Sequence, residues 1–512
     1  MTDYSENTRR IAKNTLMLYF RMFFLMILGV FSSRIVLEAL GETDYGIYSV
    51  VGGVVAMFSL VSGSLTATIN RFLAFEMGLG ESAQMGKVYS TAVNVQILLS
   101  VLIVIIAEPV GLWFIDNKMT IPPDRIEAAR FVMHFSLLSF VINLLSVPQM
   151  SAITAHEKMS AYAWVGMLDG VLRFGAALVI SVAACDRLVL YGTLMAGVVL
   201  AVRCAYGIYC RKFIPDCRYH FIHDKSLLKQ MTKFAGWSFI GVTSGVLRDQ
   251  GGNILVNMFF TPAVNAARAL AFQLNGAVQN FVTNFMTAVN PQITKSYSAG
   301  DYDYMHSLIR RSSRMSFYLL FILSLPIFFN TDFLLGIWLA SVPETTSSFV
   351  KLFVVFALSE SISNPLITAM LATDNIKKYQ IVVGGLQLLN LPVSYIFLKI
   401  GCPPQTTVAV AIVISQICLA ARLVMLRKMI NLSVRNFIKR IYLNIWKVGC
   451  TGSLLTYMAT RLLPTGTLGS CLSLLICVLI AFLSCAFVGM SSSERLEVIA
   501  MLKNRIRNDQ DN

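Results

Sequence analysis

Charged residues are scarce in this chain, and acidic residues are the scarcest. Asp, Glu, Lys and Arg make up 13% of its 512 residues, whereas hydrophobic residues make up 56%. A soluble protein of this length has too little interior to bury so much apolar surface, and the mean hydropathy is +0.66. The composition therefore excludes a soluble enzyme and predicts an all-α integral membrane protein.

The shortage of acid leaves a net charge of +15, with 42 Lys and Arg against 27 Asp and Glu. Nucleic-acid binding would require basic residues clustered on one soluble domain. Here they lie in short segments between apolar runs, mostly on one side of the predicted membrane. This is the positive-inside pattern, which predicts both termini in the cytoplasm and no nucleic-acid partner.

Sequence patterns for metal, ATP or covalent chemistry are incomplete. The ten Cys are scattered, which excludes a disulfide framework. Cys217, His220 and His223 are three residues apart, but a fourth zinc ligand is not evident. The run from Gly80 to Lys87 resembles a phosphate-binding loop of the wrong spacing and lacks its Ser or Thr. Because the external loops are also too short for a polymerase or ligase site, we expect no catalytic residues, no metal and no cofactor.

Long apolar runs predict about fourteen membrane-spanning helices. Their ranges are 14–37, 45–68, 87–110, 128–149, 160–184, 188–210, 234–258, 263–289, 312–331, 349–371, 380–399, 405–426, 443–461 and 467–489. The helices at 234–258 and 263–289 are polar enough for a hydropathy window to miss one of them. No cleavable signal is expected, because the first apolar run is too long for one.

The second half of the chain repeats the first. Three residues recur 220 positions later: Asn70, Gly80 and Met85 as Asn290, Gly300 and Met305. The segment 148–157 (PQMSAITAHE) recurs as 365–374 (PLITAMLATD). Secondary transporters use such duplicated bundles to form two lobes around a midplane site. Pro148 and Pro365, which match between the repeats, are candidate kinks or helix ends.

The repeat predicts two pseudo-symmetric six-helix lobes, 1–210 and 234–428, joined by a cytoplasmic linker, 211–233. Two extra helices, 429–490, have no earlier counterpart. The tail 491–512 begins with Ser491 and Glu494 at capping-box spacing and continues with an apolar stripe. It is predicted as an amphipathic helix on the inner leaflet, with a frayed polar tail as the alternative.

Arginines within the predicted helices are the main functional candidates, because each costs several kcal/mol unless paired or hydrated. They are Arg21, Arg34, Arg173, Arg203, Arg248, Arg268 and Arg422. We expect Arg34 to pair with Glu38 at the surface, and Arg203 and Arg422 to extend to the cytoplasmic interface. Arg21, Arg248 and Arg268 remain as candidate anion-binding residues. Arg173 is a fourth candidate, with an ion pair to Asp169 as the alternative.

Three carboxylates also lie within the predicted helices, and they are candidate carriers of a coupling ion, H⁺ or Na⁺: Asp169, Asp249 and Glu360. Four arginines against three carboxylates leave the predicted cavity mildly cationic. Such an interior favours an anionic cargo, whereas a hydrophobic drug cation would prefer carboxylates.

The helix at 263–289 carries many amide and hydroxyl side chains along one face. Asn275 and Gln279 on this face are candidate sugar contacts, because amides both donate and accept hydrogen bonds. The alternative is hydrogen bonding between neighbouring helices. Gly251 and Gly252 on the preceding helix indicate either a bend or close packing.

Several longer phrases give the sequence a family resemblance. They are GETDYGIYSVVGGVVAMFS (41–59), GWSFIGVTSGVLRDQGGNILVNMFFTPAVNAARALAFQLNGAVQNF (236–281) and NPQITKSYSAGD (290–301). The chain resembles the bacterial O-antigen and capsule flippases of the multidrug/oligosaccharidyl-lipid/polysaccharide superfamily, and among these it looks most like those of Bacteroides-type bacteria.

The resemblance implies a MATE-like bundle in the bacterial cytoplasmic membrane. It implies a flippase that moves undecaprenyl-pyrophosphate-linked oligosaccharide outward by alternating access, driven by an ion gradient, with central arginines holding the pyrophosphate. A monomer is expected, with membrane lipids and other glycan-assembly membrane proteins as candidate partners. The rival functions are a multidrug exporter of the same fold and a membrane-embedded glycan polymerase or glycosyltransferase.

Overall fold

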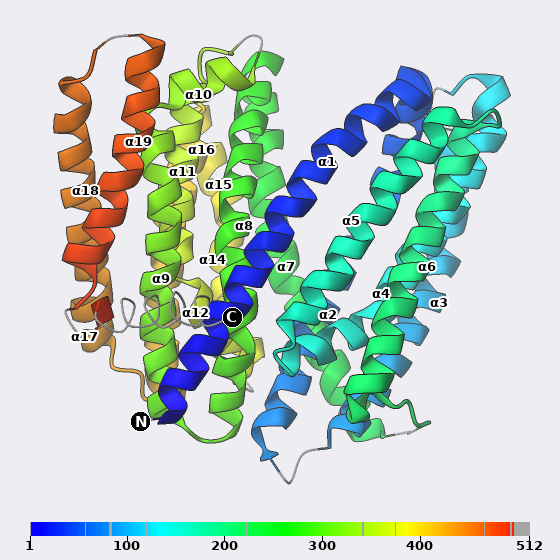
Figure 1. The fold of residues 1–512 in the computed structure, drawn as a ribbon, viewed down its shortest axis with the longest axis horizontal. Coiled ribbons are helices and arrows are strands. Elements are labelled where there is room, and N and C mark those ends of the chain that lie inside the picture. Colours follow the sequence, from blue (N-terminus) through cyan, green and yellow to red (C-terminus); the bar gives the residue numbers. More distant parts are fainter. Residues whose placement is uncertain are drawn as a thin grey trace, which may run out of the picture. The chain divides into compact units, whose positions relative to one another are not determined.

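The computed structural model describes residues 2–56, 58–80, 84–117, 121–221, 224–339, 342–373, 375–464, 466–491 and 494–495. Over these residues every regular element is helical (Figure 1). Each of the fourteen predicted ranges falls largely on helix, with short breaks in four of them, 45–68, 312–331, 349–371 and 380–399. Contacts divide the chain into a first unit, Ile11–Val242, and a second unit, Thr243–Asn512 with Met1–Arg10.

The first unit contains six long helices and the start of a seventh. They are α1 (Thr2–Ala56), α2 (Ser59–Gly78), α3 (Met85–Asn117), α4 (Ile126–Ala155), α5 (Met159–Val182), α6 (Arg187–Phe213) and the first part of α7 (Lys225–Phe259). Short 3₁₀ turns, η2 (Pro123–Arg125) and η3 (Pro215–Cys217), precede α4 and follow α6.

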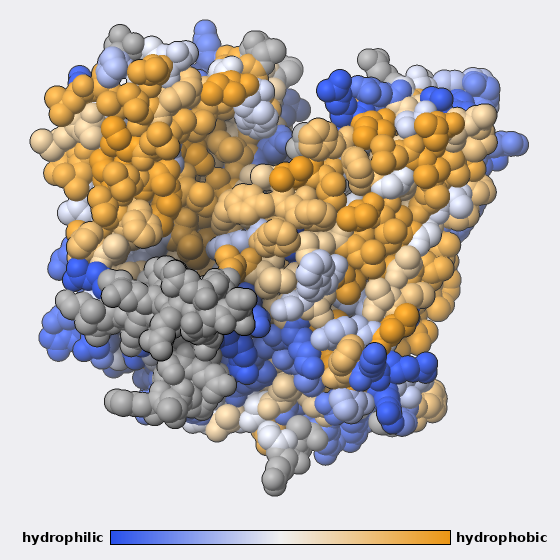
Figure 2. Space-filling model, viewed as in Figure 1, coloured by the Kyte–Doolittle hydropathy of each residue, from blue (hydrophilic) through white to orange (hydrophobic). Residues whose placement is uncertain are grey.

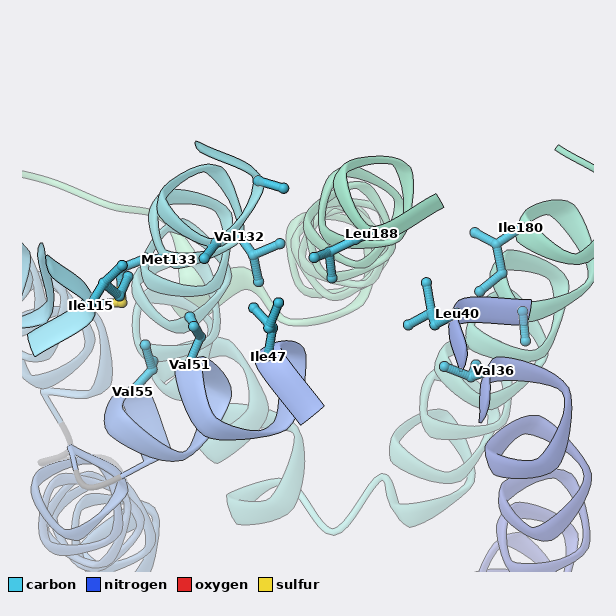
Figure 3. Close-up of a cluster of buried hydrophobic side chains, with 13 residues drawn as sticks. Val36, Leu40, Ile47, Val51, Val55, Ile115, Val132, Met133, Ile180 and Leu188 are labelled. Atoms are coloured by element: carbon cyan, nitrogen blue, oxygen red, sulfur yellow. The ribbon is translucent and has the colours of Figure 1, made fainter. Parts of the chain in front are cut away.

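A sharp break at Gly41 divides α1 into the first predicted span and the start of the second. Its φ of 74° is a backbone conformation that glycine adopts without a steric penalty. Before the break, Leu40 of α1 lies beside Ile180 of α5, and after it Ile47 turns toward Val132 and Leu188 of α4 and α6 (Figure 3). The break therefore lets one chain segment bury apolar side chains against two different helix pairs.

The second unit holds the rest of α7 and the following helices. The repeat continues with α8 (Pro262–Ser298), α9 (Tyr302–Phe329), α10 (Thr331–Trp338), α11 (Thr346–Ser361), α12 (Asn364–Ala372), α13 (Ile376–Tyr379), η4 (Gln380–Gly384), α14 (Gly385–Leu388), α15 (Asn390–Lys399) and α16 (Thr406–Ile430). After it come α17 (Val434–Phe437), η5 (Ile438–Tyr442), α18 (Leu443–Arg461), α19 (Thr467–Leu483) and η6 (Ser484–Gly489). The segments η4, η5 and η6 are π-helical turns within longer helices.

The internal repeat is visible in matched backbone and hydrogen-bond geometry. Gly80 and Gly300 both have positive φ, 63° and 74°, where α2 and α8 end. The Asn70 side chain accepts a hydrogen bond from Thr154 Oγ1 at 3.1 Å. Its repeat partner Asn290 accepts one from Thr368 Oγ1 at 2.7 Å. The two halves therefore tie α2 to α4 and α8 to α12 in the same way.

The matched prolines differ between the halves. Pro148 lies inside the continuous helix α4. Pro365 lies in the first turn of α12, directly after a break that follows α11. A proline at this position loses no intrahelical hydrogen bond. The predicted helix end is therefore found in the second unit, whereas the first unit continues through its proline.

Ten helices among the described residues are long and apolar enough to cross a membrane. They are Arg10–Gly41, Met85–Asn117, Pro123–Ala155, Met159–Val182, Arg187–Phe213, Tyr302–Phe329, Thr346–Ala372, Ile376–Lys399, Thr406–Ile430 and Thr467–Gly489. Four of the fourteen predicted spans are not among these ten: 45–68, 234–258, 263–289 and 443–461. One of the polar pair α7 and α8 was expected to be missed, and both are. Apolar side chains cover the helix flanks and hydrophilic ones gather at the helix ends (Figure 2). The chain is a multi-pass membrane protein, while the full count of fourteen spans and the orientation stay predictions.

The segment 211–233, predicted as a linker between lobes, packs against the first unit. The Tyr219 hydroxyl donates to Asn94 Oδ1 at 2.8 Å, and Lys87 Nζ lies 2.7 Å from Asp224. The contact-based division falls inside α7, after Val242. The domain boundaries stay a prediction.

The capping box predicted at the start of the tail is formed. The Ser491 N–H donates to Glu494 Oε2 at 2.9 Å, and the Glu494 N–H donates to Ser491 Oγ at 3.3 Å. The predicted amphipathic stripe lies at 496–512, outside the described residues.

Candidate functional site

In the first unit, Arg21 of α1 is held against α5. Its guanidinium lies over the Tyr162 ring, 4.5 Å from the centroid. Gly166 makes this approach possible, because a Cβ at that position would overlap the guanidinium. The buried Nε of Arg21 has no hydrogen-bond partner among the described residues. Arg21 is therefore positioned by an aromatic ring, and its hydrogen-bonding capacity is partly unused.

One turn further along α5, Asp169 and Arg173 form the predicted alternative, an ion pair. The Arg173 Nε lies 2.9 Å from Asp169 Oδ1. Both residues line a cavity of about 490 Å³ that also includes Tyr45, Tyr48 and Tyr191. Phenol hydroxyls, a carboxylate and a guanidinium thus surround a space large enough for several water molecules.

In the second unit, Arg248 of α7 lies between two carboxylates. Its Nε is 2.8 Å from Asp249 Oδ1, and its Nη1 is 3.7 Å from Glu360 Oε2 at the end of α11. The guanidinium also lies over Phe356, 5.0 Å from the ring centroid. The side chain is 13% exposed. Glu360 Oε1 is buried without a hydrogen-bond partner among the described residues, so this carboxylate is only partly satisfied.

Arg268 of α8 reaches back to the glycine-containing turn of α7. It donates to Asn253 Oδ1, and its Nη2 donates to the Asp249 carbonyl oxygen at 3.3 Å. A Cβ at Gly252 would overlap the Arg268 guanidinium. Because α7 continues without a break through this turn, Gly252 serves close approach and not a bend. Arg268 is 3% exposed, and its Nε has no hydrogen-bond partner among the described residues.

The polar face of α8 divides into two parts. Asn275, two turns after Arg268, is buried, and its Oδ1 lacks a hydrogen-bond partner among the described residues. Gln279 is half-buried one turn further. At the far end, Asn290 is bound to Thr368 of α12, which is the helix-to-helix hydrogen bond of the alternative interpretation. Unused amide capacity is thus found at the Arg268 end of the helix.

The prediction for Arg422 is wrong. Instead of extending to the interface, Arg422 of α16 is 1% exposed. Its Nε donates to the Tyr379 hydroxyl at 3.4 Å, and its charge interacts favourably with that of Glu360. The buried Nη1 has no hydrogen-bond partner among the described residues. The π-helical turn η4 begins at the residue after Tyr379, and such turns occur often at functional sites.

Arg71 was missed because the second predicted span ended at residue 68. Helix α2 continues to Gly78, so Arg71 lies within it and is 7% exposed. Its guanidinium lies over the rings of Phe72 and Phe75, 4.7 and 4.6 Å from their centroids.

Elsewhere, Arg34 pairs with Glu38 at the surface as predicted, at 2.9 Å.

The charges in each unit leave a cationic excess. Three guanidinium groups of the second unit, those of Arg248, Arg268 and Arg422, face two carboxylates, Asp249 and Glu360. In the first unit, Asp169 pairs with Arg173, while Arg21 lies over Tyr162 and forms no ion pair with a described residue. No group of three His, Cys, Asp or Glu that could hold a metal occurs among the described residues. Of the three residues at zinc-ligand spacing, Cys217, His220 and His223, the last lies outside the described residues.

No family model matches the sequence, and no curated protein matches it significantly. Solved structures of MATE transporters share its fold. A multidrug resistance MATE family transporter of the MOP superfamily in an outward-facing conformation has a TM-score of 0.73 at 11% identity, covering 83% of this chain and 96% of that chain. The Vibrio cholerae MATE transporter VcmN has a TM-score of 0.68 at 14% identity, covering 84% and 99%.

A MOP superfamily transporter from Pyrococcus furiosus, described by the reverse polarity of its binding pocket, has a TM-score of 0.70 at 12% identity. The match covers 83% of this chain and 96% of the Pyrococcus furiosus transporter. The predicted MATE-like bundle is therefore confirmed. At these identities the likeness concerns the fold.

Proposed function

We propose that this protein is a flippase that moves a lipid-linked oligosaccharide from the inner to the outer leaflet of a bacterial cytoplasmic membrane. The cargo is undecaprenyl-pyrophosphate carrying an O-antigen or capsule repeat unit. The observation that carries the proposal is the cluster of buried guanidinium groups, Arg248, Arg268 and Arg422, around only two carboxylates. Guanidinium donors match phosphate oxygens in charge and geometry.

Hydrogen-bond donors without partners in the cluster support the proposal that it binds an anion. Arg268 Nε and Arg422 Nη1 are buried without hydrogen-bond partners among the described residues. A buried charged donor left unsatisfied costs about 1–3 kcal/mol, which a phosphate oxygen would recover. The Asn275 amide, two turns along α8, supplies both a donor and an acceptor for sugar hydroxyls.

The carboxylates provide a route for coupling to an ion gradient. Glu360 is shared by Arg248 and Arg422 and keeps one oxygen without a hydrogen bond. Protonation of Glu360 or Asp249 would free a guanidinium to bind the diphosphate. After deprotonation, the carboxylate would compete with the diphosphate for that guanidinium. Asp169, at the cavity of the first unit, is a second candidate for binding H⁺ or Na⁺. Outward movement of two negative charges also gains about 4.6 kcal/mol per 100 mV of inside-negative potential.

Multidrug export is the second candidate, because MATE structures with this fold include a multidrug resistance transporter. A drug cation would need the carboxylates free, whereas here Asp249, Glu360 and Asp169 each lie beside arginine. The Pyrococcus furiosus transporter is a case in which reverse pocket polarity suggests a different function. The same argument favours an anionic cargo over a drug cation for this chain.

The discriminating experiment is deletion of the gene, followed by analysis of membrane lipids and drug sensitivity. A flippase deletion should accumulate lipid-linked repeat units on the inner leaflet and lose surface glycan, with drug sensitivity unchanged. Intact surface glycan with hypersensitivity to cationic drugs would instead identify a multidrug exporter. The protein is proposed to act as a monomer, with membrane lipids and other glycan-assembly membrane proteins as its surroundings.

A further inference from the structure

A second basic hollow, of about 420 Å³, lies in the second unit and shares no residue with the Arg248 cluster. Three cationic side chains come from α9, two from η5 and one from α18: Arg310, Arg311, Arg314, Lys439, Arg440 and Lys447. We call this set the α9–α18 basic hollow. It includes part of the two extra helices, 429–490, that have no counterpart in the repeat.

The charge of the hollow is not balanced by its own lining. Among the described residues, Glu494 is the one carboxylate that lines it, and it is paired with Arg314. None of the other five cations forms an ion pair with a described residue. Like charges gathered in one concave space repel one another, and a bound anion removes that cost.

The frame of the hollow is fixed by buried hydrogen bonds. The Tyr318 hydroxyl of α9 lies 2.6 Å from Asn444 Oδ1 and 2.9 Å from the Gly489 carbonyl oxygen. The Asn444 amide also donates to the Gly489 carbonyl at 3.2 Å. These bonds hold α9, α18 and the end of η6 together, so the helices that carry the cations keep their spacing without a ligand.

Glu494 already acts as an anion in this hollow. Burial alone would raise the pKa of Glu494, but hydrogen bonds from the Ser491 N–H and Arg314 outweigh burial and hold it below its ordinary value. The capping box at Ser491 fixes where this carboxylate lies. Glu494 pairs with Arg314, so the remaining cations of the hollow are available to an external ligand.

The surroundings of the hollow are those of a membrane interface. Leu443 and Trp446, on the same stretch of α18 as Asn444 and Lys447, are 48% and 58% exposed. Trp is enriched where a helix meets the lipid headgroups. An anion bound here by its phosphate would therefore have apolar surface beside it for acyl chains.

We propose that the α9–α18 basic hollow binds a phosphate-bearing anion, with the headgroup of an anionic phospholipid as its source. A soluble diphosphate shares the same chemistry and is the other source to be tested. The hollow lies at the end of α9 predicted to be cytoplasmic, where the leaflet carries anionic lipid. This inference is independent of the proposed cargo.

The test uses the full-length protein in neutral detergent, titrated separately with short-chain phosphatidylglycerol, short-chain phosphatidylcholine and inorganic pyrophosphate. We expect saturable binding of phosphatidylglycerol and weaker binding of phosphatidylcholine. The double variant Arg311→Gln/Lys447→Gln should lose about five-fold in affinity per charge removed. The matched control is Lys399→Gln/Arg461→Gln, which removes the same charge from exposed positions outside the hollow.

Glu494→Gln provides a variant with the opposite expected sign, because it removes the competing carboxylate and should tighten binding about five-fold. Saturable binding of pyrophosphate alone, weakened by Arg311→Gln/Lys447→Gln, would support the phosphate site and assign it to a soluble source. Absence of saturable binding of both anions, or an equal loss in the control double variant, would overturn the proposal.

Discussion

Arg248 Nη1 lies 3.7 Å from Glu360 Oε2, in an ion pair that joins α7 to the end of α11. The same Arg248 has a closer carboxylate, Asp249, at 2.8 Å. Glu360 therefore holds Arg248 more loosely than Asp249 does, and it also has an oxygen without a hydrogen bond. Of the two carboxylates, Glu360 is the one held less closely by arginine, and it is therefore the first candidate for the coupling role.

This geometry predicts that Glu360→Gln uncouples transport from its ion gradient. The amide keeps the shape of the side chain but carries neither a charge nor a titratable proton. Transport of lipid-linked oligosaccharide into vesicles should continue and become insensitive to an imposed H⁺ or Na⁺ gradient. An unchanged gradient dependence in this variant would remove Glu360 from the coupling role.

A methyl group at residue 252 should inactivate the protein without altering any charge. In Gly252→Ala the new Cβ would overlap the Arg268 guanidinium, so Arg268 must move away from Asn253. We expect loss of surface glycan comparable to that of Arg268→Ala. Gly245→Ala is the matched control, because Gly245 lies on the same helix and a Cβ there meets nothing within 4 Å. Equal activity of the two variants would show that the position of Arg268 does not matter.

Patterns between neighbouring residues and between repeats were sufficient to predict much of this structure. The offset that links Gly80 to Gly300 is reproduced as the same positive-φ helix end. Four-residue spacing correctly predicted the pair of Arg34 with Glu38, since residues one turn apart on a helix face each other. The polarity of α7 and α8 was correctly read as a reason for hydropathy to miss them.

What the sequence could not provide is which way a side chain faces once helices pack. Arg422 lies near a helix end, and nothing in its neighbours along the chain shows that Tyr379 and Glu360 enclose it. Gly252 is equally compatible with a bend and with close packing until Arg268 is placed beside it. Contacts between residues far apart in sequence decide both cases.

Burial of Arg422 predicts a large effect on stability. Arg422→Leu removes the hydrogen bond of a charged group to Tyr379 and one of the cations near Glu360, which should cost about 1.5–3 kcal/mol. Tyr379→Phe removes one hydrogen bond and should cost about 1 kcal/mol. Thermal unfolding in detergent should therefore give a lower Tm for Arg422→Leu than for Tyr379→Phe. Recovery of Tm in Arg422→Leu/Glu360→Gln would identify Glu360 as the group that Arg422 stabilises.

An ion-pair cluster at one end of the first unit predicts pH-dependent stability. Arg125 binds Asp44, with Nε–Oδ1 at 2.9 Å, and Asp186, with Nη1–Oδ2 at 2.7 Å. Burial would raise the pKa of Asp186, but hydrogen bonds from Arg125 and the Val189 and Leu188 N–H groups lower it overall. A lowered pKa stabilises the fold above the unfolded-state pKa, and that contribution is lost as the pH falls.

Arg125→Gln should therefore destabilise the protein by about 1–2 kcal/mol at neutral pH. The difference in Tm from the wild type should begin to shrink once the pH falls below about 3.9, the unfolded-state pKa of Asp, and should be lost as the pH passes through the lower pKa of Asp186 in the folded wild type. Arg130→Gln is the control, because its pair with Asp116 is more exposed. A Tm difference that stays constant over this pH range would rule out the carboxylates as its origin.

The central claim is that buried guanidinium groups carry the diphosphate across the membrane. Its most direct measurement is translocation of lipid-linked oligosaccharide by purified protein in liposomes, followed by cleavage of the exposed sugar with an impermeant glycosidase. Arg268→Gln should abolish translocation, while the exposed-site variant Arg34→Gln should retain it. Wild-type rates of translocation by Arg268→Gln and by Arg248→Gln/Glu360→Gln would contradict the account.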